Sequence, residues 1–217
     1  MKGMLVVLDP KKRQKKLAEK AAKRKEKKEK AGGTGHLPGL VSKSQQLAGV
    51  PVHECLVPVE LFKIGLGSVV VTRKMKDGQL ALASILIDVF CLGVKDATFA
   101  VVSKDQYESY KEGLNRRQES KITDPSCVRK LVEGAVEYAR DLGFEPHKDY
   151  KKARQIFGNY DSEECPETFV YGRDDLPCFI SGPYDTPGRC KKIIDTLTRN
   201  CGEGNYHIMI GGTGSDF

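Results

Sequence analysis

The sequence contains no apolar run long enough to cross a membrane or to form the core of a signal peptide. The longest apolar stretch, Leu80–Val94, is interrupted by Ser84 and Asp88 and is shorter than the roughly 20 residues that span a bilayer. The first ten residues, MKGMLVVLDP, contain a run of only four apolar residues, Leu5–Leu8. We therefore expect no signal peptide and no membrane partner.

The sequence also lacks a Cys-x-x-Cys pair, the pattern that is typical of structural zinc sites. His53-Glu54-Cys55 matches the start of a nucleobase-deaminase site, whose second half is Pro-Cys-x-x-Cys. Here Pro177-Cys178 is followed three positions later by Ser181, so the second sulfur is missing. We expect neither a structural nor a catalytic zinc ion.

The cysteines do not form a regular disulfide framework. Their number is odd, and most of them lie inside apolar segments, which is typical of buried free thiols rather than of a secreted scaffold. This pattern favours a reducing compartment, and we expect a cytoplasmic protein, or a nuclear one if the organism is eukaryotic. The seven cysteines are Cys55, Cys91, Cys127, Cys165, Cys178, Cys190 and Cys201.

No nucleotide-binding loop is evident. Gly-Gly-Thr-Gly occurs at residues 32–35 and 211–214, but a phosphate-binding loop needs a following helix whose N-terminus faces the anion. After the second copy only three residues remain. We also find no signature of nucleases, helicases, methyltransferases, RNA-recognition modules or ribosomal proteins. The sequence therefore does not indicate which cofactor, if any, the protein binds.

What the sequence does have is a strongly uneven charge distribution. Residues 1–30 carry 13 basic and 4 acidic residues, a net charge of +9, whereas residues 31–217 carry 23 basic and 25 acidic residues, a net charge of −2. The overall charge of +7 therefore belongs to the N-terminal segment.

The segment from Lys11 to Lys30 predicts a nucleic-acid-binding tail. Basic side chains at this density neutralise phosphates and release counterions, and the absence of aromatic residues favours recognition of backbone charge over base stacking. The alternative is a solubilising extension without a specific partner. A membrane-surface helix is disfavoured because the segment has no apolar face. The predicted nucleic-acid-binding residues are Lys11, Lys12, Arg13, Lys15, Lys16, Lys20, Lys23, Arg24, Lys25, Lys27, Lys28 and Lys30.

Composition divides the chain into two parts. We expect residues 1–46 to form a basic tail, disordered or a fraying helix, followed by a flexible linker that begins at Gly32-Gly33. Residues 47–217 are expected to form one domain.

Strand patterns dominate the first half of this domain. Residues 68–73 and 79–90 are rich in β-branched and aliphatic residues and flank Lys76-Asp77-Gly78, which predicts a β-hairpin. Residues 97–102 predict a third strand.

Helices follow, one of them with clear end signals. Residues 103–118 begin with a possible capping box, and residues 124–142 begin with Asp124 and Pro125 and repeat apolar residues at helical spacing. Further expected elements are a helix over 149–157, a hairpin of 169–172 with 178–181, a helix from Thr186 and a strand over 206–210. This order favours an α+β fold with a mainly antiparallel sheet and helices packed on it.

A set of polar residues next to the apolar centre forms a candidate catalytic site. Asp88 and Asp96 lie near a strand end and could hold a divalent metal ion for phosphodiester cleavage, assisted by His147 and Asp149. The same residues could equally cap turns and form ion pairs. A cysteine nucleophile, Cys91 with His147 as its base, is a further alternative.

Three functions therefore remain open. The first is a nucleic-acid-associated or ribonucleoprotein-associated protein that docks on RNA or DNA through its tail, with a possible protein partner for the body. The second is a metal-dependent nuclease or other hydrolase, the only alternative that implies a divalent metal. The third is a protein–protein adaptor, for which we expect an exposed apolar patch on the body. Whether the protein is an enzyme stays open.

Overall fold

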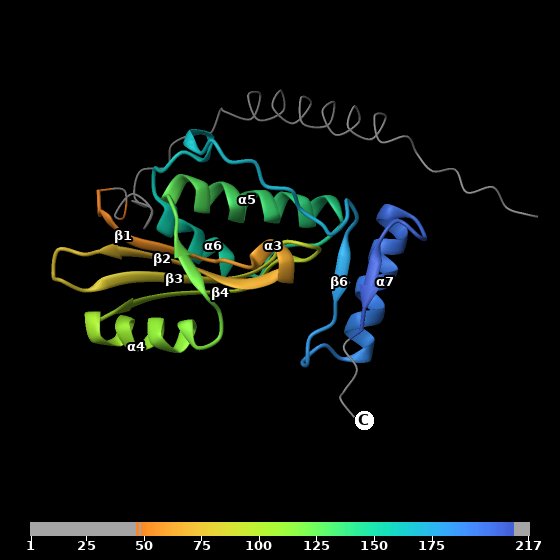
Figure 1. Ribbon diagram of the computed structural model, residues 1–217, viewed down its shortest axis with the longest axis horizontal. Coiled ribbons are helices and arrows are strands. Elements are labelled where there is room, and N and C mark those ends of the chain that lie inside the picture. Colours follow the sequence, from red (N-terminus) through yellow and green to blue (C-terminus); the bar gives the residue numbers. More distant parts are fainter. Residues whose placement is uncertain (1–46, 48, 211–217) are drawn as a thin grey trace, which may run out of the picture. The chain divides into compact units, whose positions relative to one another are not determined.

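A five-stranded sheet lies at the centre of the computed structural model, which describes residue 47 and residues 49–210 (Figure 1). The strand order is β4-β3-β2-β1-β5, and each neighbouring pair is antiparallel. Helices pack on this sheet, so the predicted α+β class is confirmed. The strands are β1 (Val52–Pro58), β2 (Leu66–Lys74), β3 (Leu80–Asp88), β4 (Gly93–Val102) and β5 (Ser120–Ile122).

The predicted hairpin is formed by β2 and β3. These strands pair from Leu66↔Asp88 to Lys74↔Leu80. The turn is closed by Met75 N–H, which donates to the Gln79 carbonyl over 2.8 Å, and Gly78 adopts a φ of +83° that glycine accommodates without a Cβ clash.

Helix α4 (Lys104–Asn115) covers one face of the sheet. The predicted capping box at its start is present, with Ser103 and Gln106 bonding each other's backbone amides. Tyr107 and Leu114 of α4 pack in one buried cluster with Leu82 and other residues from this face of the strands.

The opposite face is covered by α5 (Pro125–Asp141) and α6 (Tyr150–Ala153), followed by the 3₁₀ turn η1 (Arg154–Phe157). Asp124 caps α5 by accepting a hydrogen bond from Ser126 N–H, as its sequence predicted. The largest buried cluster lies between these helices and the sheet.

The C-terminal part of the described chain differs from the sequence prediction. Strand β6 (Cys178–Ile180) pairs in parallel with β7 (His207–Met209), and α7 (Pro187–Cys201) connects them. The predicted hairpin of residues 169–172 with 178–181 is therefore wrong. In place of a ladder with β6, residues 169–172 pack against α5 and Phe62, and Gly172 N–H donates to the Val89 carbonyl over 2.9 Å.

Arg73 is the last residue of the predicted strand 68–73 and the penultimate residue of β2, and it is buried with only 1% of its surface exposed. Its guanidinium donates to the carbonyls of Leu47, Val50, Ile156 and Phe157 and lies 5.1 Å from the ring centre of Tyr160. One side chain thus ties the start of the described chain to η1.

Within the described ranges, no helix is both long and apolar enough to span a bilayer.

Candidate functional site

Asp88, the first predicted catalytic residue, lies at the end of β3 and is buried. Its Oδ1 accepts hydrogen bonds from Phe90 N–H and Cys91 N–H, both over 2.9 Å. Burial raises the pKa of the Asp88 carboxyl, while these amides and the charge of Lys95 oppose that rise. The side chain therefore orders the turn between β3 and β4.

The other three predicted residues lie together at the outer edge of β4. His147 Nδ1 lies 3.6 Å from Asp96 Oδ1 and 3.7 Å from Asp149 Oδ2. The backbone fixes this arrangement, because His147 N–H donates to the Val94 carbonyl over 2.9 Å. The group is solvated, and the side chain of Asp96 is 60% exposed.

Asp96, His147 and Asp149 thus lie together, but their side chains are not arranged as metal ligands. In the part of the chain that the structure describes, no group of three or more His, Cys, Asp or Glu residues is placed to hold a metal ion. The carboxylates of Asp96 and Asp149 instead flank one imidazole nitrogen. Catalysis by Asp88, Asp96, His147 and Asp149 stays a prediction.

The buried thiols are poor nucleophiles. Burial raises the pKa of Cys91 far above its ordinary value, and the charge of Asp88 raises it further. Burial likewise raises the pKa of Cys55 to about 12. Since the thiolate is the reactive form, the raised pKa of Cys91 does not favour the nucleophilic role considered for it from the sequence.

The twelve basic residues predicted to bind nucleic acid, from Lys11 to Lys30, lie outside the described residues.

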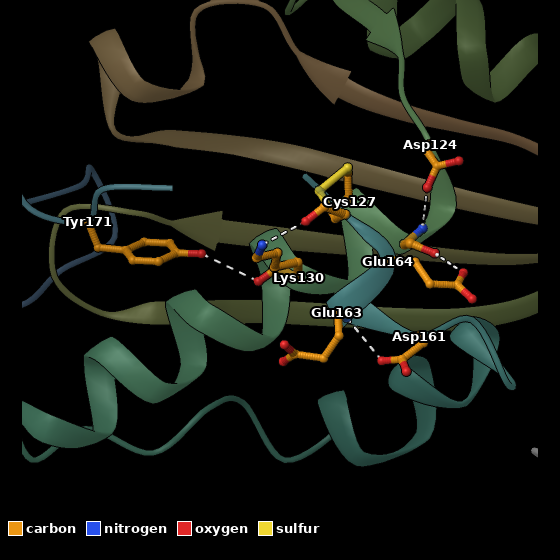
Figure 2. The surroundings of a disulfide bond; sticks show 9 residues. Asp124, Cys127, Lys130, Asp161, Glu163, Glu164 and Tyr171 are labelled. Atoms are coloured by element: carbon orange, nitrogen blue, oxygen red, sulfur yellow. Dashed lines mark hydrogen bonds between the residues drawn. A yellow bond between two sulfur atoms is a disulfide. The ribbon is translucent and has the colours of Figure 1, made fainter. Parts of the chain in front are cut away.

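A disulfide joins Cys127, in the first turn of α5, to Cys165, which directly follows the 3₁₀ turn η2 (Ser162–Glu164) (Figure 2). The Cα atoms are 4.8 Å apart, and the two cysteines are separated by 38 positions in the sequence. This bridge departs from the expectation of free thiols. None of the other five cysteines, all of which lie in the described ranges, forms a disulfide, and Cys55, Cys91 and Cys178 among them are buried.

Further contacts fix the segment after the bridge to α5. Lys130 Nζ donates to the Cys165 carbonyl over 2.8 Å, and Tyr171 OH reaches the Lys130 carbonyl over 3.5 Å (Figure 2). Tyr171 OH also donates to the Leu131 carbonyl over 2.8 Å. Gly134 makes room for Tyr171, because a Cβ at this position would collide with the tyrosine hydroxyl. Residues 165–171 are thus held at both ends.

This segment forms one wall of a groove with a volume of about 440 Å³, which we call the β5 groove. Further lining residues come from β5, β1, α5 and the short helix α3 (Leu61–Ile64). The volume lies within the roughly 300–1,000 Å³ of most ligand sites. Its lining residues are Val57, Pro58, Val59, Leu61, Phe62, Lys121, Thr123, Leu131, Glu167, Thr168, Phe169, Val170 and Gly172.

Large apolar side chains are exposed on and beside this groove. Val59, Phe62 and Val170 line it, and each exposes 40% or more of its surface. Ile122 of β5 is 75% exposed. The Phe62 ring stacks on Phe169 with ring centres 5.9 Å apart, so the exposed side chains are held in place. Exposed apolar groups gathered around a groove are typical of interaction surfaces.

Sequence reasoning missed this groove because four separate parts of the chain build it. The only local signal lay in the apolar residues of Phe169-Val170, which were assigned to a strand. Comparisons with protein-family models, with curated proteins and with solved structures found no match.

Proposed function

We propose that this is a nucleic-acid-associated protein that docks on RNA, DNA or a ribonucleoprotein through Lys11–Lys30. The observation that supports the proposal is the division of charge, +9 in residues 1–30 against −2 in the remainder. Binding by such a segment is sequence-independent and salt-sensitive, because it rests on contacts with phosphates.

The proposal is tested by neutralising the tail of the full-length chain. Six lysines of the tail are replaced by glutamine in one variant. The control replaces six exposed lysines of the body, so that both variants lose the same charge. The tail set is Lys11, Lys12, Lys15, Lys16, Lys20 and Lys23, and the body set is Lys74, Lys76, Lys104, Lys148, Lys151 and Lys192.

Fluorescence anisotropy with a labelled single-stranded RNA measures the dissociation constants of all three proteins. We expect the tail variant to bind at least tenfold more weakly than the wild type, and the body variant to bind nearly as well as the wild type. Equal losses in the two variants would mean that net charge alone drives binding, and the tail would have no special role.

A second function, that of a protein–protein adaptor, is supported by the exposed apolar side chains around the β5 groove. In this proposal the tail holds the protein on nucleic acid and the body binds a protein partner. The two activities use different parts of the chain, so each can be tested without the other.

A further inference from the structure

Strand β5 is an outer strand of the sheet, and it pairs only with β1. Thr123 N–H donates to the Cys55 carbonyl, and Val59 N–H donates to the Glu119 carbonyl. Bonding directions alternate along an antiparallel pair, so Lys121 also bonds towards β1, whereas Ser120 and Ile122 direct their N–H and C=O groups away from it. Among the described residues, no further strand pairs with this edge.

The open edge lies beside the β5 groove. Lys121 and Thr123 line the groove on the face of the sheet that carries α5, together with Val57 and Leu131. Ile122 alternates to the other face, beside its buried cross-strand partner Leu56. Successive side chains of a strand added to β5 would therefore point alternately into the groove and towards Ile122 on the other face.

Two polar features of this wall lack partners within the described residues. Lys121 takes part in none of the ion pairs between described residues, and the buried hydroxyl of Thr123 makes no hydrogen bond there. In an added antiparallel strand, the residue directly across from Lys121 would have its side chain on the same face and at close range. Opposite charges in such a cross-strand pair are stabilising, so an acidic residue complements Lys121.

We propose that β5 and its groove bind an extended peptide strand of a partner protein by strand addition. The strand carries an acidic residue opposite Lys121 and, two positions away, a serine or threonine opposite Thr123, whose hydroxyl forms a hydrogen bond with the Thr123 hydroxyl. The backbone groups of Ser120 and Ile122 supply hydrogen bonds, and the groove supplies side-chain selectivity. This inference rests on the adaptor function proposed above and names the class of partner.

The test uses the full-length protein and a display library of seven-residue peptides as the probe. The decisive variant is Ile122→Pro, which removes an N–H that faces away from β1 and leaves the bonds between β1 and β5 in place. Its matched control is Ile122→Ala, which keeps that N–H. Lys121→Glu tests the selectivity.

The wild type is expected to enrich proline-free peptides that carry an acidic residue and, two positions away, a serine or threonine. The enriched peptide should bind Ile122→Pro at least tenfold more weakly than Ile122→Ala, and Lys121→Glu should enrich basic residues at the acidic position. Affinity for RNA should be unchanged in all of these variants, which separates this inference from the nucleic-acid proposal.

A second measurement does not depend on the proline variant. Adding the enriched peptide to the wild type should protect the Ile122 amide from hydrogen exchange. The inference is overturned if no peptide is enriched, if the enriched peptide leaves Ile122 unprotected, or if sedimentation shows a dimer that Ile122→Pro dissociates. In the last case the occupant of the edge would be a second copy of the chain.

Discussion

Replacing Arg73 by alanine should strongly destabilise the domain. Arg73 is 1% exposed, and its guanidinium donates to four backbone carbonyls at distances between 2.5 and 2.9 Å. Those carbonyls belong to residues at the start of the described chain and to η1, and the substitution would leave all four without this donor. A buried polar group that loses its partner costs about 1–3 kcal/mol.

Adding four such costs would overestimate the effect, because water and small shifts compensate part of it. A hydrogen bond to a charged group contributes about 1.5–3 kcal/mol, and with this compensation we expect Arg73→Ala to lower the free energy of unfolding by about 3–5 kcal/mol. Arg73→Lys should recover only part of the loss, because an ammonium group offers three donors and lacks the planar fork that reaches separate carbonyls.

Urea unfolding followed by circular dichroism measures these differences. Arg117→Ala is the matched control, because Arg117 is exposed and donates to a single carbonyl, that of Gly113, over 3.1 Å. The control should stay within about 0.5 kcal/mol of the wild type. A loss below about 1 kcal/mol for Arg73→Ala would refute the argument that these four bonds hold the two segments together.

Three further predictions concern other buried or paired groups. Asp88→Asn keeps the acceptor for Phe90 N–H and Cys91 N–H and removes a buried charge. Because burial raises the folded-state pKa of Asp88, the wild type should lose stability as pH rises through that pKa. Thermal unfolding at several pH values should show that the variant lacks this loss. Replacing both Cys127 and Cys165 by serine should lower the free energy of unfolding by about 2–4 kcal/mol. A reducing agent should have no effect on the stability of this variant. A wild type that is equally stable with and without reductant would contradict the disulfide. Burial opposes ionisation of Glu54, but hydrogen bonds from Lys111 and Tyr107 hold its pKa below the ordinary 4.5. The stability of the wild type should therefore fall as pH drops below 4.5. Lys111→Met should reduce this fall in acid titrations followed by fluorescence.

The elements that could be predicted from the sequence are those with local signals. Helix α5 begins at Asp124 and Pro125 because these residues suit its first turn, and its apolar residues repeat at helical spacing. The hairpin of β2 and β3 follows from the Asp77-Gly78 turn between two apolar runs. In these cases neighbouring residues alone decide the structure.

Other elements depend on partners that are distant in the sequence. Strand β5 has three residues and a polar pattern, and it is a strand only because β1 lies beside it. Residues 169–172 look like a strand, but the Tyr171 hydroxyl and the Phe62 ring hold them against other parts of the fold.

The candidate sites follow the same rule. The sequence order suggested that Asp88 and Asp96 act together; in the structure Asp88 accepts hydrogen bonds from turn amides, whereas Asp96 lies beside His147. His147 meets Asp96 only because its backbone bonds to the edge of β4. The disulfide and the β5 groove each join segments that carry no shared local signal.

The most direct test of the proposed function is the salt dependence of RNA binding by the full-length protein and by the variant with six neutralised tail lysines. Each phosphate contact to a single strand contributes about 0.7 to the slope of log affinity against log salt concentration. If the tail docks on RNA, the slope of the wild type should be steep, and neutralising six contacts should reduce it by up to about 4. Identical slopes and affinities for the two proteins would contradict the proposal.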